Sequence, residues 1–133
     1  MRHLEERLEH DLNEIRDQVA LMAGHVDKAI GDAIYAFQHC DVKLANNTVL
    51  NDLPINRASR KIDKLCHAFI ALHLPSAGHL RLLSSVIRAN IILERIGDYA
   101  VTIAREAIQL DCALDSHLSR ELDRVGGEVR LVL

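Results

Sequence analysis

Two carboxylates one helical turn apart are the residues of this sequence best suited to binding chemistry. Glu94 and Asp98 lie in the run ILERIGDYA, residues 92–100, with Gly97 between them. Side chains four positions apart on a helix are neighbours, so both carboxylates can reach one divalent cation through oxygen. Gly97 weakens the helix and removes a side chain where a metal cluster or a second helix approaches closely. The spacing therefore predicts a metal site on this helix face.

The same pair also has a simpler interpretation. Glu94 and Asp98 can belong to a solvated helix face, with Arg95 or Arg105 as ion-pair partners. This spacing of acids occurs by chance in many helices, so it does not by itself decide between a metal site and a solvated face.

Oxygen-bearing side chains in an earlier segment favour the metal site. Asp52, Asn56 and Asp63 stand at i, i+4 and i+11, which places them within about 40° on one face of a continuous helix. Pro54 weakens this geometry, because a break there rotates Asp52 relative to Asp63 and leaves Asp52 as a helix cap. The residues predicted to hold a divalent or trivalent metal are Glu94, Asp98, Asp63 and Asp52.

The eight histidines are poorly arranged for a metal centre of their own. His67 and His73 are six positions apart, on nearly opposite helix faces, while His3 and His10 share a face near a fraying helix end. The sequence lacks ExxH and HxxxH spacings, which disfavours a ferritin-like di-iron core. Surface or supporting positions are therefore expected for the histidines.

Composition narrows the class of protein. The 133 residues carry a net charge of −3, which lacks the basic surplus typical of nucleic-acid binding. No apolar run approaches the ~18 residues of a membrane span, and the N-terminus MRHLEERLEHDL is too charged for a signal peptide. Cys40, Cys66 and Cys112 lie far apart without CxxC spacing, which favours reduced thiols. We predict a cytoplasmic protein without a nucleic-acid partner or a transmembrane segment.

Long helices must position these side chains, because apolar residues recur at steps of four and three over residues 8–37 and 82–110. Aromatic residues make up 3% of an otherwise helix-favouring composition. In the later stretch the predicted apolar seam is Leu82, Val86, Ala89, Leu93, Ile96, Ala100, Ile103, Ala107 and Leu110. Glu94 and Asp98 then lie about 100° to 140° from the seam, facing outward from a bundle.

The segment between these helices, residues 41–74, has two interpretations. Either one helix kinks at Pro54, or a short helix ends near Asn51 and a new one has Pro54 in its first turn. Pro75 then opens a helix over about residues 76–110. The sequence predicts an all-α fold, an antiparallel up-down-up bundle of three long helices.

A short C-terminal helix is expected after the bundle. The stretch DCALDSHLS, residues 111–119, is typical of a loop, with Asp115 or Ser116 as a cap for the helix in ELDRVGGEVRLVL. That helix ends with the apolar residues 131–133, and the sequence does not indicate which surface they pack against.

Taken together, these motifs resemble the PhoU family of phosphate-uptake regulators. LNEIRDQVALMAGHVDKAIGDAI is similar to the family's first helix, and NDLPIN with KIDKLC is similar to its second. PSAGHLR followed by ILERIGDYAVTIA resembles the proline-led third helix and its acidic ExxxD motif. LERIGD after that helix start is the most specific part, and the resemblance covers residues 4–110.

The resemblance also implies a domain organisation. Family members consist of two three-helix repeats, each with an acidic metal motif, and ELDRVGGEVRLVL resembles the opening of a second repeat. We therefore expect one repeat over residues 1–112 and a linker with the start of an incomplete second repeat over residues 113–133. One departure stands out: the family favours Asp where this chain has His79, which either brings nitrogen to the metal site or is a surface substitution.

For function, the resemblance implies a regulator rather than an enzyme. Family members are cytoplasmic, often dimeric, and carry iron, zinc, manganese or magnesium at the acidic motifs. They negatively modulate phosphate import and the phosphate-starvation response by contacting a sensor histidine kinase and the ATPase of the phosphate transporter. We expect the same partners here, a homodimer, and membrane association only peripherally through partners.

Two other classes of function stay open from the residues alone. One is a metal-free helical bundle for oligomerisation, which elemental analysis separates from a metal-binding regulator. The other is a carboxylate-bridged metallohydrolase, which requires an open metal position and a positioned base. No candidate base stands at a suitable spacing in the sequence.

Overall fold

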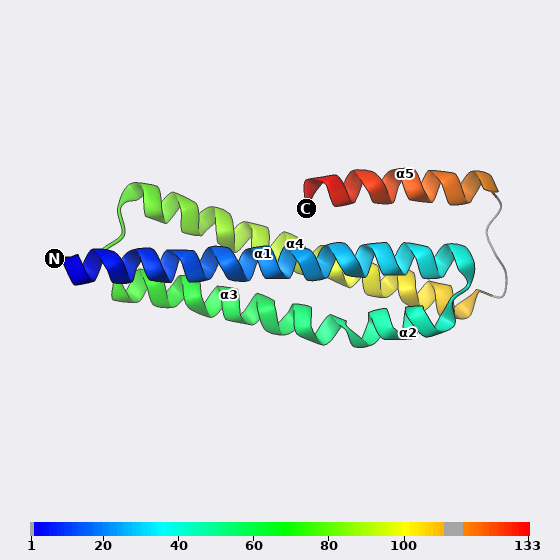
Figure 1. Cartoon of the computed structure of the whole chain (residues 1–133), viewed down its shortest axis with the longest axis horizontal. Coiled ribbons are helices and arrows are strands. Elements are labelled where there is room, and N and C mark those ends of the chain that lie inside the picture. Colours follow the sequence, from blue (N-terminus) through cyan, green and yellow to red (C-terminus); the bar gives the residue numbers. More distant parts are fainter. Residues whose placement is uncertain (1, 111–115) are drawn as a thin grey trace.

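A computed structural model of the chain describes residues 2–110 and 116–133 and folds them into helices. The helices are α1 (Arg2–His39), α2 (Val42–Leu50), α3 (Asp52–Leu72), α4 (Ala77–Gln109) and α5 (Ser116–Val132). Figure 1 shows α1, the pair α2 and α3, and α4 as three rods of alternating direction, with α5 lying beside α1. The predicted all-α bundle of three long helices is confirmed.

The second rod is broken, as one of the two interpretations of Pro54 requires. α2 ends at Leu50, Asn51 joins the two helices, and α3 starts at Asp52 with Pro54 in its first turn. A proline is tolerated there because the first backbone N–H groups of a helix have no intrahelical acceptor. Asp52 is therefore the first residue of α3 rather than its cap.

Side chains and backbone geometry define the ends of the other rods. Cys40, with φ 51°, reverses the chain after α1, and the Asp41 carboxylate caps α2 by accepting from the Leu44 N–H at 3.0 Å. Ser76 caps α4 by accepting from the N–H of His79 at 3.2 Å. These caps satisfy helix-end donors that otherwise lack partners.

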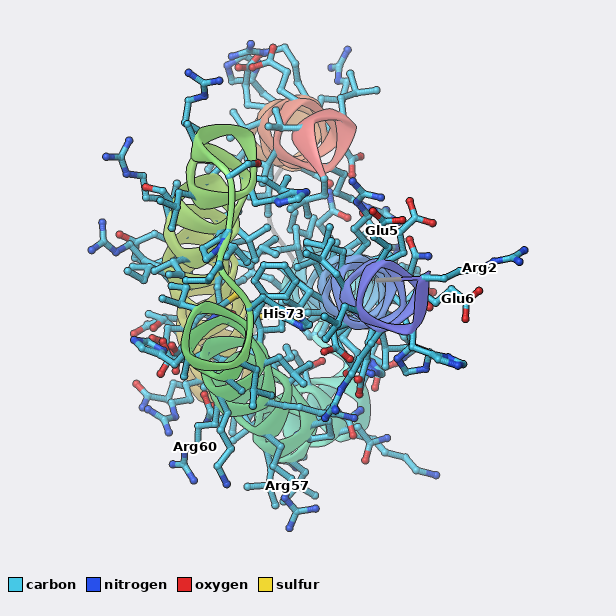
Figure 2. All side chains as sticks on the ribbon, turned by 90° about the vertical axis from the view of Figure 1, so that its left-hand side faces the viewer. Arg2, Glu5, Glu6, Arg57, Arg60 and His73 are labelled. Atoms are coloured by element: carbon cyan, nitrogen blue, oxygen red, sulfur yellow. The ribbon has the colours of Figure 1, made fainter. Side chains whose placement is uncertain are left out.

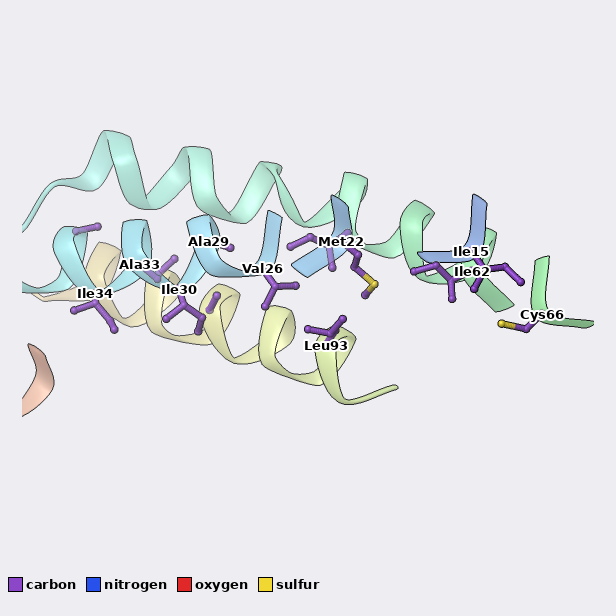
Figure 3. Packing of buried hydrophobic residues seen from close by; sticks show 14 of the residues in the cluster. Ile15, Met22, Val26, Ala29, Ile30, Ala33, Ile34, Ile62, Cys66 and Leu93 are labelled. Carbon is purple, nitrogen blue, oxygen red and sulfur yellow. The ribbon is translucent and has the colours of Figure 1, made fainter. Parts of the chain in front are cut away.

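The core lies along the inner face of α1, where it meets α3 and α4 (Figure 3). Every residue of the stripe predicted over residues 8–37 is buried or half-buried. Burial of one large apolar side chain contributes about 1.5–3 kcal/mol. The largest fully buried side chains are Phe69, Ile15, Met22, Ile55, Ile62, Leu83, Val26 and Cys66.

The buried face of α4 differs from the predicted seam. Leu93, Ala100 and Ala107 are buried as predicted, whereas Ile96 and Ile103 are only half-buried. The buried positions are Leu83, Asn90, Leu93, Gly97, Ala100, Val101, Ala104 and Ala107. Their centre is rotated by about 60° from the predicted seam, at 100° per residue. An apolar pattern missed this rotation because it gives no weight to an asparagine or a glycine.

The rotation corrects the predicted orientation of the two acids. Glu94 lies at the edge of the packed face and is half-buried against α3, so it does not face outward. Asp98 is exposed, as predicted. The pair therefore spans the rim between the core and the solvent.

The C-terminal helix α5 packs on α1. The Arg130 guanidinium donates two hydrogen bonds to Asp27 at 2.7 and 3.2 Å, and Gln38 donates to the Ser119 carbonyl at 2.9 Å. Gly126 allows close contact, because a Cβ there would lie 2.3 Å from Ile34 Cδ1. The predicted Asp115 cap and the boundary after residue 112 lie outside the described residues, so the domain division stays a prediction.

Candidate metal centre between two helices

A close approach of α3 to α4 builds the candidate site. Gly97 faces Ile55 of α3, and a Cβ on Gly97 would lie 3.2 Å from Ile55 Cγ2 and 3.9 Å from Val26 Cγ2 of α1. The absence of a side chain lets a buried isoleucine pack against the α4 backbone. The glycine between Glu94 and Asp98 therefore brings α3 next to these acids.

A short polar chain crosses this contact. The Ser59 hydroxyl of α3 donates to Glu94 Oε2 at 2.9 Å, and the Asn90 amide donates to the Ser59 carbonyl at 2.9 Å. Ser59 and Asn90 are both buried. Because both hydrogen bonds join α3 to α4, they fix the Glu94 carboxylate against α3.

Sequence reasoning missed Ser59 and Asn90, although helical spacing was available as a signal. Ser59 stands seven positions after Asp52, and Asn90 stands four before Glu94, so each shares a face with a predicted acid. Both are small polar residues within otherwise apolar stripes, which is where a polar network has to lie.

Asp52 is the third carboxylate of the site. Its Oδ2 accepts from the Asn56 amide at 3.1 Å, while Oδ1 is buried with no hydrogen-bond partner among the described residues. Burial, followed by the nearby charges of Asp98 and Glu94, raises the pKa of Asp52, against the opposing effects of Asn56 and Arg105. The structure therefore brings Asp52 of α3 near both acids of α4.

Asp63 is not part of this group. It lies eleven residues after Asp52 on the same helix, which is about 16 Å along the axis. Its side chain is 58% exposed and lies 3.5 Å from the ring of His67. Shared angular position on a helix does not compensate for three turns of axial separation, so Asp63 cannot ligate an ion held by Asp52.

The three remaining carboxylates suit a hard cation by charge and by donor type. A buried carboxylate oxygen without a hydrogen-bond donor, next to two further acids, is a group that an oxygen-binding cation would satisfy. Among the described residues, the only three acid, His or Cys donors within 4.8 Å of one another lie elsewhere, on α1. Asp52, Glu94 and Asp98 therefore need side-chain rotamer changes to share one ion.

His79, the departure noted in the sequence, lies far from these acids. It is in the first turn of α4, fifteen residues and about 22 Å of helix axis before Glu94. Its ring packs edge-on to Phe69, with centroids 6.1 Å apart. His79 therefore does not add nitrogen to the acidic site.

Comparisons with known proteins identify the family of this chain. The family model described as "PhoU domain" matches residues 19–107, which is most of the chain. The chain belongs to the PhoU family. The matched residues include all three carboxylates and Gly97.

Individual PhoU proteins extend the match. A phosphate-specific transport system accessory protein PhoU homolog of Pseudomonas putida is 40% identical over 81% of this chain and 42% of its own length. The PhoU protein of Escherichia coli (strain K12) is 35% identical over 81% of this chain and 45% of its own length. The chain spans less than half the length of these curated relatives.

A solved structure shows the same fold. The crystal structure of PhoU from Pseudomonas aeruginosa superposes with a TM-score of 0.85 at 35% sequence identity. The match covers 92% of this chain and 59% of that one. The fold of most of this chain therefore has an experimental counterpart.

Proposed function

We propose that this chain is an accessory regulator of phosphate transport that negatively modulates uptake and phosphate-starvation signalling. The observation that carries the proposal is 35–40% identity over 81% of the chain to proteins named phosphate-specific transport system accessory proteins. The role is regulatory rather than catalytic, and the chain acts by protein contacts. None of the described helices is long and apolar enough to cross a membrane.

The acidic site supports the proposal that this regulator binds a metal. Asp52, Glu94 and Asp98 would hold a divalent or trivalent ion, such as iron, zinc, manganese or magnesium. The ion would bind the Asp52 oxygen that has no hydrogen-bond partner among the described residues and would join α3 to α4. Ser59 orients Glu94 through its hydrogen bond, and Asn56 orients Asp52. Asp98, the exposed member, gives the ion an open side toward a partner.

We propose that this chain forms a homodimer in the cytoplasm. Its proposed partners there are a sensor histidine kinase and the ATPase of the phosphate transporter. A bundle with a broad core, fixed by buried apolar residues on three rods, gives such partners a rigid surface. The ion at the rim of α3 and α4 makes the docking surface depend on metal.

A complementation assay tests the function. A bacterial strain without its own PhoU protein carries a phosphate-starvation reporter, and this chain is expressed in it under plentiful phosphate. We expect the reporter to fall, and we expect the E94Q/D98N variant to lose that effect at equal protein level. An unchanged reporter with the wild-type chain would contradict the proposal.

The same protein preparation separates the other functional classes. A metal-free wild-type protein without partner binding would favour an oligomerisation bundle. Phosphate release from a phosphomonoester by the metal-loaded protein, lost in E94Q/D98N, would favour a metallohydrolase. We expect neither result.

A further inference from the structure

A second group of metal-binding side chains lies near the start of α1, outside the acidic site. His10, Asp11 and Glu14 each offer one donor atom, and the three atoms lie within 4.8 Å of one another. His10 and Glu14 are one helical turn apart, so they share a face with Asp11 beside them. His10 Nδ1 lies 3.4 Å from Asp11 Oδ1. Three donors of two chemical types therefore lie close to one another on this part of α1.

A fourth side chain reaches this group from another helix. His73, at the C-terminal end of α3, is 6% exposed, and its Nε2–H donates to Asp11 Oδ2 at 2.8 Å. Its ring packs on Phe69 with centroids 4.6 Å apart. Figure 2 shows His73 directed inward between α3 and α1. This contact is independent of the spacing on α1, since it joins residues 62 positions apart.

The two contacts divide the oxygens of Asp11 between them. Oδ2 is held by His73, and Oδ1 faces His10 and remains able to ligate. Ligating carboxylates in metalloproteins are commonly held by such a second hydrogen bond.

We propose that His10, Asp11 and Glu14 form a binding site for Zn²⁺ or a similar transition-metal ion, with His73 positioning the Asp11 ligand. One imidazole nitrogen and two carboxylate oxygens match the donor preference of zinc, and the exposed side of His10 leaves a position for water. Calcium and magnesium prefer oxygen donors alone. The ion would join α1 to the end of α3 through the Asp11–His73 contact.

This site and the acidic site cannot share an ion. Ser59, which contacts Glu94, precedes His73 by fourteen residues on α3, or about 21 Å of helix axis. The two proposals therefore make separate predictions, and a variant of one site leaves the other intact.

Cobalt and zinc titrations test the proposal. The full chain, carrying E94Q/D98N to silence the acidic site, is stripped of metal and titrated with Co²⁺ while visible absorption is recorded. We expect one equivalent to bind with the intense absorption of a low-coordinate Co²⁺ site, and Zn²⁺ to displace it. In that background His10→Asn should weaken binding at least about 10-fold, and His73→Gln about 10- to 100-fold through loss of positioning.

A matched control is available on α3. His67 lies one turn after Asp63, with its ring 3.5 Å from that carboxylate, and belongs to no group of three close donors among the described residues. His67→Asn should therefore leave the Co²⁺ affinity unchanged. His10 is exposed, so its replacement leaves the core intact, and circular dichroism checks that His73→Gln keeps its helices. Equal affinity of His10→Asn and its parent, or an equal loss in His67→Asn, would overturn the proposal.

Discussion

At the scale of single residues, the ionisation of Asp52 affects both the stability of the fold and the binding of the proposed metal. Its pKa is raised by burial and by two neighbouring acids, so the folded chain holds this proton more tightly than the unfolded chain does. The contribution of Asp52 to the free energy of unfolding is therefore largest at low pH. It is lost as the pH rises from near 3.8 through the raised pKa of the folded state. Above the raised folded pKa, the ionised Asp52 destabilises the metal-free protein.

Removing that charge should stabilise the protein without metal. We expect Asp52→Asn to raise the free energy of unfolding by a few tenths of a kcal/mol at neutral pH, the usual size of a like-charge contact near the surface. The gain should vanish below about pH 4, where Asp52 is protonated in both states. Urea denaturation across pH measures it, with the exposed Asp63→Asn as control. A loss of stability at neutral pH would contradict the assignment.

At the scale of elements, helix packing explains which parts of the site were predictable. The rods followed from apolar residues at steps of four and three, and the acids at 94 and 98 followed from one-turn spacing. The rotation of α4 did not, since Gly97 and Asn90 occupy its packed face without any apolar side chain. Asp63 was misplaced for another reason: helical phase gives the face of a residue but not its distance along the axis.

Gly97 should tolerate no branched side chain. We expect Gly97→Val to cost about 1–3 kcal/mol, because its Cβ would already lie 3.2 Å from the buried Ile55 and two methyls must follow. Gly24 has no atom within 4 Å of such a Cβ, and Gly24→Val should gain a few tenths of a kcal/mol from helix propensity. Chemical denaturation of the two variants measures the difference. Equal effects would mean that α3 and α4 do not pack through Gly97.

Docking of α5 on α1 rests partly on Arg130 and Asp27. The hydrogen bonds from Arg130 hold the pKa of Asp27 below its usual value, so their contribution is full above about pH 4 and is lost as pH falls through the lowered pKa. The pair is partly exposed, so we expect Arg130→Ala to weaken docking by about 0.2–1 kcal/mol.

Hydrogen exchange of the α5 amides measures that docking. Protection factors, which correct for the slower intrinsic exchange in acid, should fall in Arg130→Ala and, for the wild type, as pH is lowered. Arg124 is the matched control, since its ion pairs with Glu121 and Glu128 stay within α5. If Arg124→Ala and Arg130→Ala behave alike, the contact with Asp27 does not hold α5 in place.

At the scale of the whole molecule, the chain is a PhoU-family bundle with two separate groups of side chains that we propose as metal ligands. One lies between α3 and α4 near the middle of the rods, and the other lies between α1 and the end of α3. An ion at the acidic site would join α3 to α4, and an ion on α1 would hold the Asp11 side chain that contacts His73. A regulator that acts by contact benefits from such rigidity, because less conformational entropy is lost on docking.

Metal content of the acidic site tests the central claim most directly. His10→Asn protein, in which the α1 site is disabled, is compared with His10→Asn carrying E94Q/D98N after both are loaded with excess iron or manganese and desalted. We predict that the first retains bound metal and the second has none, with the same helical circular dichroism. Equal metal content in the two proteins would contradict a metal centre at Asp52, Glu94 and Asp98.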